Sequence, residues 1–267
     1  YYSTVNKNNE KTQIFLNAYL QAEIIKGLKY KLNLGLRKDH NRSRTYTGIY
    51  DLGSAGKNDA PDLSEGSSDY ESWVLENTLN YDKVFGKHNI SALVGYSAQK
   101  DKSYGLNGSN TDIPEFIYTM TGNVKTMTAS SSLKELTLVS LFGRVMYTYD
   151  DRYLFSASIR RDGSSRFQKD NRWGTFWSVG ANWRISQEKF MQNLIWISNL
   201  SAKISYGEQG NDNLLRYDSL EGGYVPDYYP WQGLYPLEYP NANQVGGLIG
   251  ALENKKLSWE KSGNLNV

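Results

Sequence analysis

Few residues in this chain have the types and spacing that catalysis requires. The two histidines, His40 and His88, lie beside no candidate nucleophile and no cluster of metal-ligating residues in the sequence. Ser131 and Lys134 have the Ser-x-x-Lys spacing of one nucleophile motif, but they fall in a serine-rich stretch where chance explains the match better. The chain has no cysteine, which excludes a thiol nucleophile, a disulfide framework and a cysteine metal site. The sequence therefore predicts a protein that is not an enzyme and that needs no cofactor.

Acidic residues gather in one stretch rich in glycine and serine: Asp51, Asp59, Asp62, Glu65 and Asp69. Calcium prefers several such carboxylate oxygens on a flexible loop. The spacing does not match the calcium-binding loop of an EF-hand. We therefore expect a solvated loop, with a calcium site on it as the alternative.

The densest polar cluster is Arg160-Arg161-Asp162-Gly163-Ser164-Ser165-Arg166-Phe167. Three arginines beside an aspartate could bind an anion, yet such groups more often form ion pairs that anchor a loop. Because side chains alternate along a strand, Arg160 and Asp162 should share one face and Arg161 should lie on the other. The cluster therefore predicts a loop-anchoring network.

Another segment is crowded with aromatic residues: Tyr224, Tyr228, Tyr229, Trp231, Tyr235 and Tyr239. Exposed aromatic rings stack on sugars and anchor protein partners. We expect the first five of these residues to contact either a substrate or a partner protein. Packing of the segment on itself is the alternative.

The dominant pattern in the chain is alternation of apolar and polar residues, which indicates β-strands with one apolar face. One such run is Leu28, Tyr30, Leu32, Leu34 and Leu36. Runs of this kind predict about nine strands of roughly ten residues or more. The turns near residues 26, 86 and 151 are short, whereas the other connections are long and polar: 40–70, 100–134, 163–172 and 208–256.

Short turns at one end and long loops at the other are typical of an outer-membrane β-barrel and unusual in a compact soluble domain. Aromatic residues make up 13% of the chain, and Tyr and Trp suit a surface with an apolar and a wet edge. No apolar run reaches the roughly 18 residues of a transmembrane helix. The net charge of +2 gives no electrostatic case for nucleic acid. We therefore predict an all-β, transmembrane antiparallel β-barrel with long extracellular loops.

The two faces of each strand then meet different surroundings. The apolar face should meet outer-membrane lipid, with Tyr147, Tyr149, Tyr153 and Phe155 in an aromatic girdle near one turn. The polar face should line a water-filled lumen with these charged residues: Arg144, Arg160, Asp162 and Arg184. A soluble all-β glycan-binding or adhesion module is the alternative, because the faces of a sandwich alternate in the same way.

Residues 141–186 carry a more specific signal. They read LFGRVMYTYDDRYLFSASIRRDGSSRFQKDNRWGTFWSVGANWRIS, and EKFM and ISYGEQGND follow at 188–191 and 204–212. The order of these elements resembles the SusC/RagA family of TonB-dependent transporters of Bacteroidetes. The chain departs from that family at Gln168, where a small residue is common, and at Trp177, where a proline is common.

The resemblance implies a barrel of about 22 strands around a plug, in the bacterial outer membrane. Residues 1–267 would be a central segment of its wall, with the plug domain, the TonB box and the barrel ends outside them. It also implies active import of oligosaccharides or peptides, with TonB and a SusD-like surface lipoprotein as partners.

Overall fold

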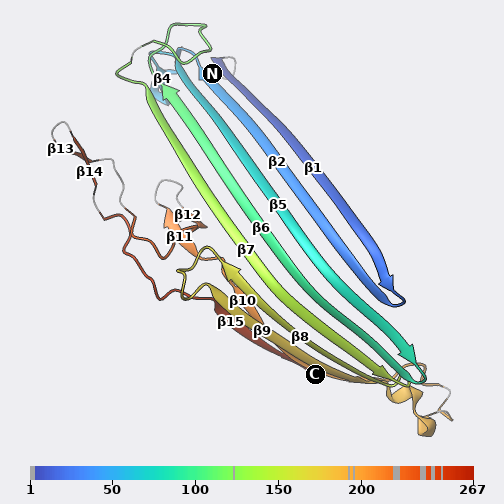
Figure 1. The fold of residues 1–267 in the computed structure, drawn as a ribbon. Coiled ribbons are helices and arrows are strands. Elements are labelled where there is room, and N and C mark those ends of the chain that lie inside the picture. The colour runs from blue at the N-terminus through green and yellow to red at the C-terminus, as the bar shows by residue number, and fades with distance from the viewer. Residues whose placement is uncertain are drawn as a thin grey trace. The chain divides into compact units, whose positions relative to one another are not determined.

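The computed structural model describes residues 4–122, 124–191, 193–194, 196–218, 223–234, 239–241, 244–247 and 249–267. Within these ranges the regular structure is almost entirely β-strand (Figure 1). Short 3-10 turns lie at Gly53–Ala55 (η2), Ile185–Gln187 (η3) and Lys189–Met191 (η4). Among the described residues, no helix has the length and apolar character needed to cross a membrane.

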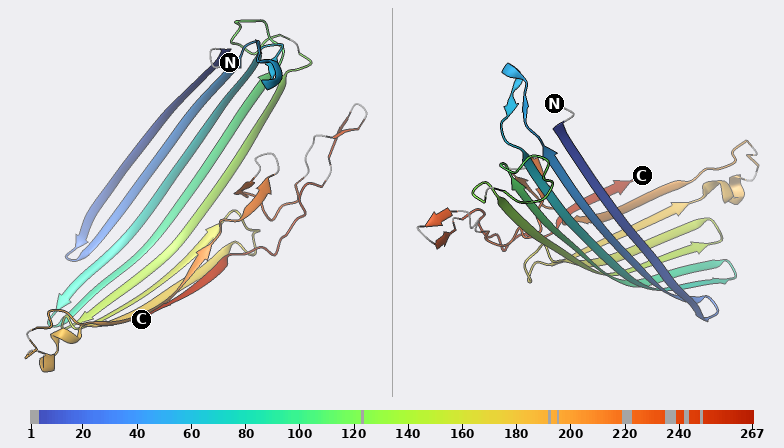
Figure 2. Two further views of the ribbon diagram at one scale, coloured as in Figure 1. Left: turned by 180° about the vertical axis from the view of Figure 1, so that it is seen from behind. Right: turned by 90° about the horizontal axis from the view of Figure 1, so that it is seen from above.

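Nine strands pair in one sheet in the order β1-β2-β5-β6-β7-β8-β9-β10-β15 (Figures 1 and 2). Their bounds are β1 Val5–Ile25, β2 Leu28–Thr47, β5 Asp62–Phe85, β6 His88–Asn110, β7 Thr128–Tyr149, β8 Tyr153–Ser164, β9 Trp173–Trp183, β10 Ala202–Asn211 and β15 Glu260–Asn266. The order follows the chain, as expected of consecutive antiparallel hairpins. The prediction of an all-β antiparallel fold of about nine strands is confirmed.

Three two-stranded hairpins lie between these strands. They pair β3 (Tyr50–Asp51) with β4 (Lys57–Asn58), β11 (Leu215–Asp218) with β12 (Gly223–Pro226), and β13 (Tyr239–Asn241) with β14 (Gln244–Gly246).

The chain divides into two compact units. Unit 1 contains Tyr1–Asn17, Gly35–Trp73 and Lys100–Glu135, and unit 2 contains Ala18–Leu34, Val74–Gln99 and Leu136–Val267. Each unit is described below by itself.

The apolar side chains of unit 2 are exposed. Val94, Val145 and Val179 have exposed fractions of 58%, 49% and 48%. A β-sandwich would seal such residues between two sheets. No second layer covers them among the described residues, so the sheet of unit 2 is not half of a sandwich.

The tight turns use backbone conformations with positive φ. Gly27 and Gly86 have φ of 84° and 57°, and the turn between β7 and β8 places Asp150 and Asp151 at 52° and 54°. Two consecutive residues with positive φ match the right-handed twist of the strands that a two-residue hairpin joins. Aspartate tolerates this region better than most side chains, which explains its use here.

Several strands extend further than the alternating pattern predicts. β2 continues to Thr47 and β5 begins at Asp62, whereas the sequence suggested a loop over 40–70. Similarly, β6 ends at Asn110 and β7 begins at Thr128, which shortens the predicted loop at 100–134. Apolar residues such as Tyr46, Leu63 and Leu106 are sparse in these extensions, so no sustained alternation marks them although the backbone pairs normally.

Candidate functional site

The strand register of unit 2 places one set of polar side chains on a common face. Ser158 pairs with Arg144 on β7 and with Ser178 on β9, and the Ser158 and Ser178 hydroxyls lie 2.7 Å apart. Phe142 and Phe176 are the partners of Arg160 on either side. Because directly paired residues share a face, all of these side chains lie together on what we call the polar face.

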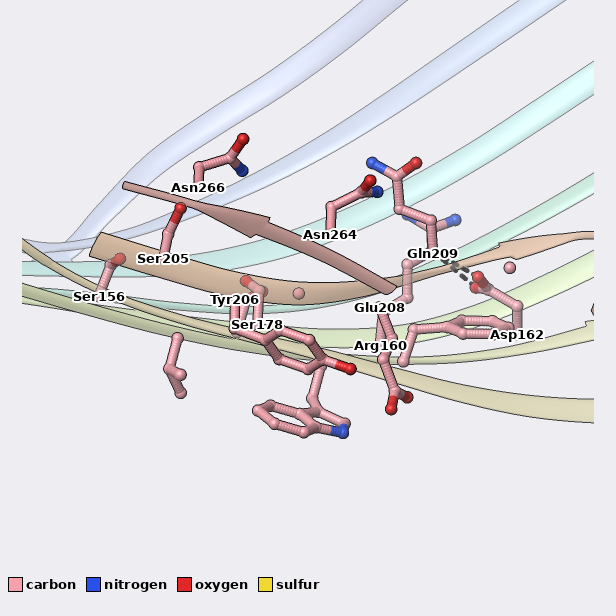
Figure 3. A pocket seen from close by; sticks show the side chains of 16 residues that line it. Ser156, Arg160, Asp162, Ser178, Ser205, Tyr206, Glu208, Gln209, Asn264 and Asn266 are labelled. Carbon is pink, nitrogen blue, oxygen red and sulfur yellow. Dashed lines mark hydrogen bonds and ion pairs between the residues drawn. The ribbon is translucent and has the colours of Figure 1, made fainter. Parts of the chain in front are cut away.

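The polar face contains a hollow of about 680 Å³ over β8, β9, β10 and β15 (Figure 3). Apolar side chains from Phe176, Trp177, Val179 and Tyr206 make up part of its lining. Hydroxyl and amide groups make up another part: Ser156, Ser158, Ser178, Ser205, Gln209, Asn264 and Asn266. Gly207 leaves room at the bottom of the hollow, since a Cβ there would lie 2.9 Å from Ser178 Cβ. Such a surface can donate hydrogen bonds to, and accept them from, uncharged polar groups.

Of the charged residues that line this hollow, Arg160, Asp162 and Glu208, the first two form a pair. Arg160 Nε lies 2.7 and 2.8 Å from the two carboxylate oxygens of Asp162, and Arg160 also donates to Ser140 Oγ at 2.9 Å. The guanidinium stacks on the Phe142 ring at 5.6 Å. The structure thus brings Arg160 and Asp162 together on the polar face, and their opposite charges balance each other.

The other arginines of the cluster lie in different surroundings. Arg161 is on the opposite face, with its guanidinium 5.3 Å from the Trp173 ring centroid. Arg166 is buried and donates to the Asp212 carbonyl at 2.9 Å and to Asn213 Oδ1 at 3.1 Å. These contacts have the loop-anchoring character that the sequence suggested.

Phe167 also holds the loop after β8 in place. It is fully buried and lies 5.5 Å from the Trp259 ring, which in turn lies 5.4 Å from Phe176. Ser164 Oγ donates to Asp212 at 2.7 Å. The loop after β8 is thereby fixed to the segments that flank β10 and β15.

The two remaining predicted lumen arginines lie outside the hollow. Arg144 is exposed on the polar face of β7. Arg184 lies just past the end of β9 and donates to the Asp151 carbonyl at 3.3 Å. The structure therefore groups Arg160 with Asp162 but does not bring Arg144 or Arg184 to them.

The aromatic residues of the long segment are divided between two environments. Tyr224 is 73% exposed and packs edge-on against Tyr217, with 5.5 Å between the ring centroids. Tyr228, Tyr229 and Trp231 are half-buried. Tyr228 lies under the Arg166 guanidinium at 5.5 Å. Tyr235 lies outside the described residues.

The acidic residues at 51–69 are dispersed. Asp51 accepts a hydrogen bond from the Gly53 amide at 2.8 Å, Asp59 pairs with Lys57, and Asp69 pairs with His40. Within the described ranges, no group of three or more His, Asp or Glu side chains is placed to hold a metal ion. The calcium hypothesis gains no support from this arrangement.

The sequence did not predict one cluster, which surrounds Glu188. Glu188, only 8% exposed, accepts hydrogen bonds from Tyr153 Oη at 2.6 Å, Arg152 Nη1 at 2.9 Å and Trp183 Nε1 at 3.1 Å. Arg152 also pairs with Asp150 in the preceding turn. The hydrogen bond from Tyr153, followed by the one from Trp183, holds the pKa of Glu188 below its ordinary value of 4.5. The Asp-Arg-Tyr turn and the later Glu-Lys-Phe-Met were visible in sequence, but their contact was not.

Comparison with known proteins places this geometry in a family. The model of the family "TonB dependent receptor-like, beta-barrel" matches residues 1–267. TonB-dependent receptor P3 of Formosa agariphila is 32% identical over 258 residues, which cover 94% of this chain and 24% of that protein. TonB-dependent receptor SusC of Bacteroides thetaiotaomicron is 36% identical over 140 residues, covering 49% of this chain and 13% of SusC.

A solved structure agrees with these relatives. The chain superposes on a structure of the RagAB peptide transporter with a TM-score of 0.84 and 25% identity, over 98% of this chain and 28% of that one. The chain thus spans about a quarter of the length of its first curated relatives. The chain belongs to the TonB-dependent receptor-like β-barrel family.

Proposed function

We propose that this chain is part of the wall of a bacterial outer-membrane importer, and that residues 1–267 form a central segment of its barrel. The observation that carries the proposal is the opposition of the two faces in unit 2. One face exposes Val145 and Ile159 without a covering layer among the described residues, and the other carries the Arg160–Asp162 pair and the Ser158 and Ser178 hydroxyls. Lipid outside and water inside would satisfy both faces at once.

The aromatic residues near the β7–β8 turn support the same orientation. Tyr147 stacks with Phe155 at 6.4 Å, and Tyr149 stacks with Tyr153 at 6.3 Å, on the same face as Val145. Rings of this kind are enriched where a membrane meets water. A soluble glycan-binding or adhesion module would leave both the rings and the exposed aliphatic side chains facing water.

The whole importer would act with partners that lie outside this chain. The named relatives are receptors and transporters and not enzymes, which supports transport over catalysis. We propose uptake of oligosaccharides or peptides, energised through TonB, with a SusD-like lipoprotein closing the extracellular mouth. Solved structures similar to this chain are described as a peptide transporter and a peptide importer, which supports peptides as one class of cargo. No cofactor enters this role.

Fractionation and uptake together test the proposal. The parent protein should be recovered from outer membranes only after detergent extraction. Deleting its gene should abolish uptake of one class of oligosaccharide or peptide, and collapsing the proton gradient should have the same effect. Recovery of the parent protein in a soluble fraction would contradict the proposal.

A further inference from the structure

The apolar face of β2 changes character within unit 1. Leu36 is 52% exposed on this face, and the next side chains on the same face are Lys38, His40, Arg42 and Arg44. Lys38 pairs with Glu71 and His40 with Asp69, each at 2.8 Å. The two arginines beyond them have no hydrogen bond or ion pair within the part of the chain that the structure describes.

Arg44 is held in place although its polar atoms are incompletely satisfied. Its Nε is buried and has no hydrogen-bond partner among the described residues. Its guanidinium lies 5.7 Å from the Tyr118 ring, and Tyr118 packs edge-on against Tyr46 at 4.7 Å. The side chain also lines the smaller of the two hollows described below, so the ring contact holds its guanidinium beside space that a ligand could occupy.

A small hydrophobic core holds the aromatic residues beside Arg44 in a fixed arrangement. Tyr46, Leu63 and Ile113 are at most 5% exposed and pack with Met120. The Tyr46 hydroxyl accepts the amide N–H of Phe116 at 3.1 Å, and Phe116 has a φ of 62°. The β6–β7 loop is therefore fixed against β2 and β5, and Tyr118 with it.

Two hollows meet at Arg42. The smaller, of about 90 Å³, is lined by Asn8, Glu10, Arg42 and Arg44. It has room for a group of roughly three water volumes, and its two guanidinium groups outweigh one carboxylate. The larger, of about 470 Å³, mixes polar and apolar walls that include His40, Arg42, Glu65, Ser67, Leu106 and Met120. A phosphate would fit the first hollow and a sugar the second.

The distance of the two arginines from the membrane hydrocarbon, measured along the membrane normal, decides which lipid headgroup could reach them. Arg42 is six residues beyond Leu36, or about 20 Å along the strand. With the usual barrel tilt of about 40°, this becomes about 15 Å along the membrane normal. The headgroup layer of a phospholipid bilayer extends only about 5–8 Å beyond its hydrocarbon. A phospholipid phosphate would thus lie near Lys38, whereas a saccharide headgroup extends far enough to reach Arg42.

We propose that Arg42 and Arg44 bind a phosphorylated saccharide headgroup of an outer-leaflet glycolipid. This inference rests on the proposed outer-membrane location. Arg44 is the preorganised contact and Arg42 the exposed one, and both would make charge-assisted hydrogen bonds to phosphate. Glu65 and Ser67 would accept and donate hydrogen bonds to sugar hydroxyls.

The test uses the full-length parent protein, extracted from its own outer membranes in mild detergent. Native mass spectrometry would count the glycolipid molecules retained by the wild type, by Arg42→Gln and by the double variant Arg42→Gln/Arg44→Gln. Lys31→Gln is the matched control, since it removes a cation from the opposite face of β2. We expect about tenfold weaker retention for Arg42→Gln, a further loss for the double variant and none for Lys31→Gln.

Two results would overturn the inference. One is equal glycolipid retention by the wild type and Arg42→Gln, which is an exposed substitution that does not endanger folding. The other is complete displacement of the glycolipid by inorganic phosphate alone, which would reduce the site to an unspecific anion site. Failure of the proposed function would look different, because the parent protein would then be absent from outer membranes.

Discussion

Arg160 and Asp162, two residues apart on β8, form a side-on ion pair in which Arg160 Nε reaches both carboxylate oxygens, at 2.7 and 2.8 Å. The Asp162 side chain is 11% exposed and that of Arg160 is 52% exposed. A similar pair exists on the polar side of β2, where Arg37 Nε lies 3.1 Å from both oxygens of Asp39. Phe142 flanks the first guanidinium and Phe15 the second. Both pairs place a cation on the wall while cancelling its charge locally.

Replacing Asp162 with Asn should show how much the Arg160–Asp162 ion pair contributes to stability. The variant keeps the shape of the side chain but leaves Arg160 without its counter-ion, so we expect a loss of about 1 kcal/mol in unfolding free energy. Asp59→Asn is the matched control, because Asp59 and its partner Lys57 are both well exposed and such pairs contribute little. Urea unfolding of the parent protein in detergent measures both, and equal stability of the two variants would contradict the prediction.

A close contact between Gly95 and Phe142 yields a packing prediction. A Cβ on Gly95 would lie 2.3 Å from Phe142 Cζ, so Gly95→Ala must displace the ring and should cost about 1–3 kcal/mol. Adding Phe142→Leu should recover part of that cost, which a double-mutant cycle would measure. Gly143→Ala is the control, since its Cβ would find its nearest neighbour at 3.6 Å. A cost for Gly95→Ala that Phe142→Leu leaves unchanged would show that the ring is not the obstacle.

How much of this could be foreseen depends on which physical signal each feature leaves in the sequence. Alternation assigned Arg160 and Asp162 to one face correctly, because the period of a strand is two and one face is apolar there. It failed at His40 and Arg42, which the sequence placed in a loop, because both faces are polar there although β2 continues. The hydrogen bonds from Arg152 and Tyr153 to Glu188 join residues 36 and 35 positions apart, and no local sequence pattern specifies a contact over that separation.

The Glu188 cluster predicts a pH dependence of stability. The pKa of Glu188 is lower in the folded protein than its ordinary 4.5. The ionised carboxylate therefore contributes stability that is complete above about pH 4.5 and that is lost as the pH falls through the lower, folded-state pKa. Glu188→Gln should remove this contribution and flatten the dependence below pH 4.5. Denaturation followed at several pH values would show this, with the exposed Glu253→Gln as a control that keeps the wild-type slope.

The opposition of the two faces can be tested by chemical labelling, since this chain has no cysteine. Ser158→Cys places a thiol on the polar face and Val145→Cys places one on the apolar face. In intact membranes, a water-soluble maleimide should label Ser158→Cys at least about tenfold faster, because a thiol in lipid is not ionised. Detergent extraction followed by unfolding should make the two rates equal. Faster labelling of Val145→Cys in membranes would reverse the proposed orientation.

Tyr224 and Trp231 lie in the same aromatic-rich segment, and variants at the two positions can distinguish contact with a partner from structural support. Tyr224 is 73% exposed, whereas Trp231 is half-buried and its Nε1 is buried. Tyr224→Ala should therefore weaken cargo uptake or lipoprotein binding without lowering thermal stability, because exposed rings act as anchors. Trp231→Ala should lower stability by about 1–3 kcal/mol, because it removes a partly packed ring. Pull-down of the lipoprotein and thermal denaturation on both variants separate the two roles. If Tyr224→Ala leaves uptake and lipoprotein binding unchanged, the segment's contribution is packing on itself.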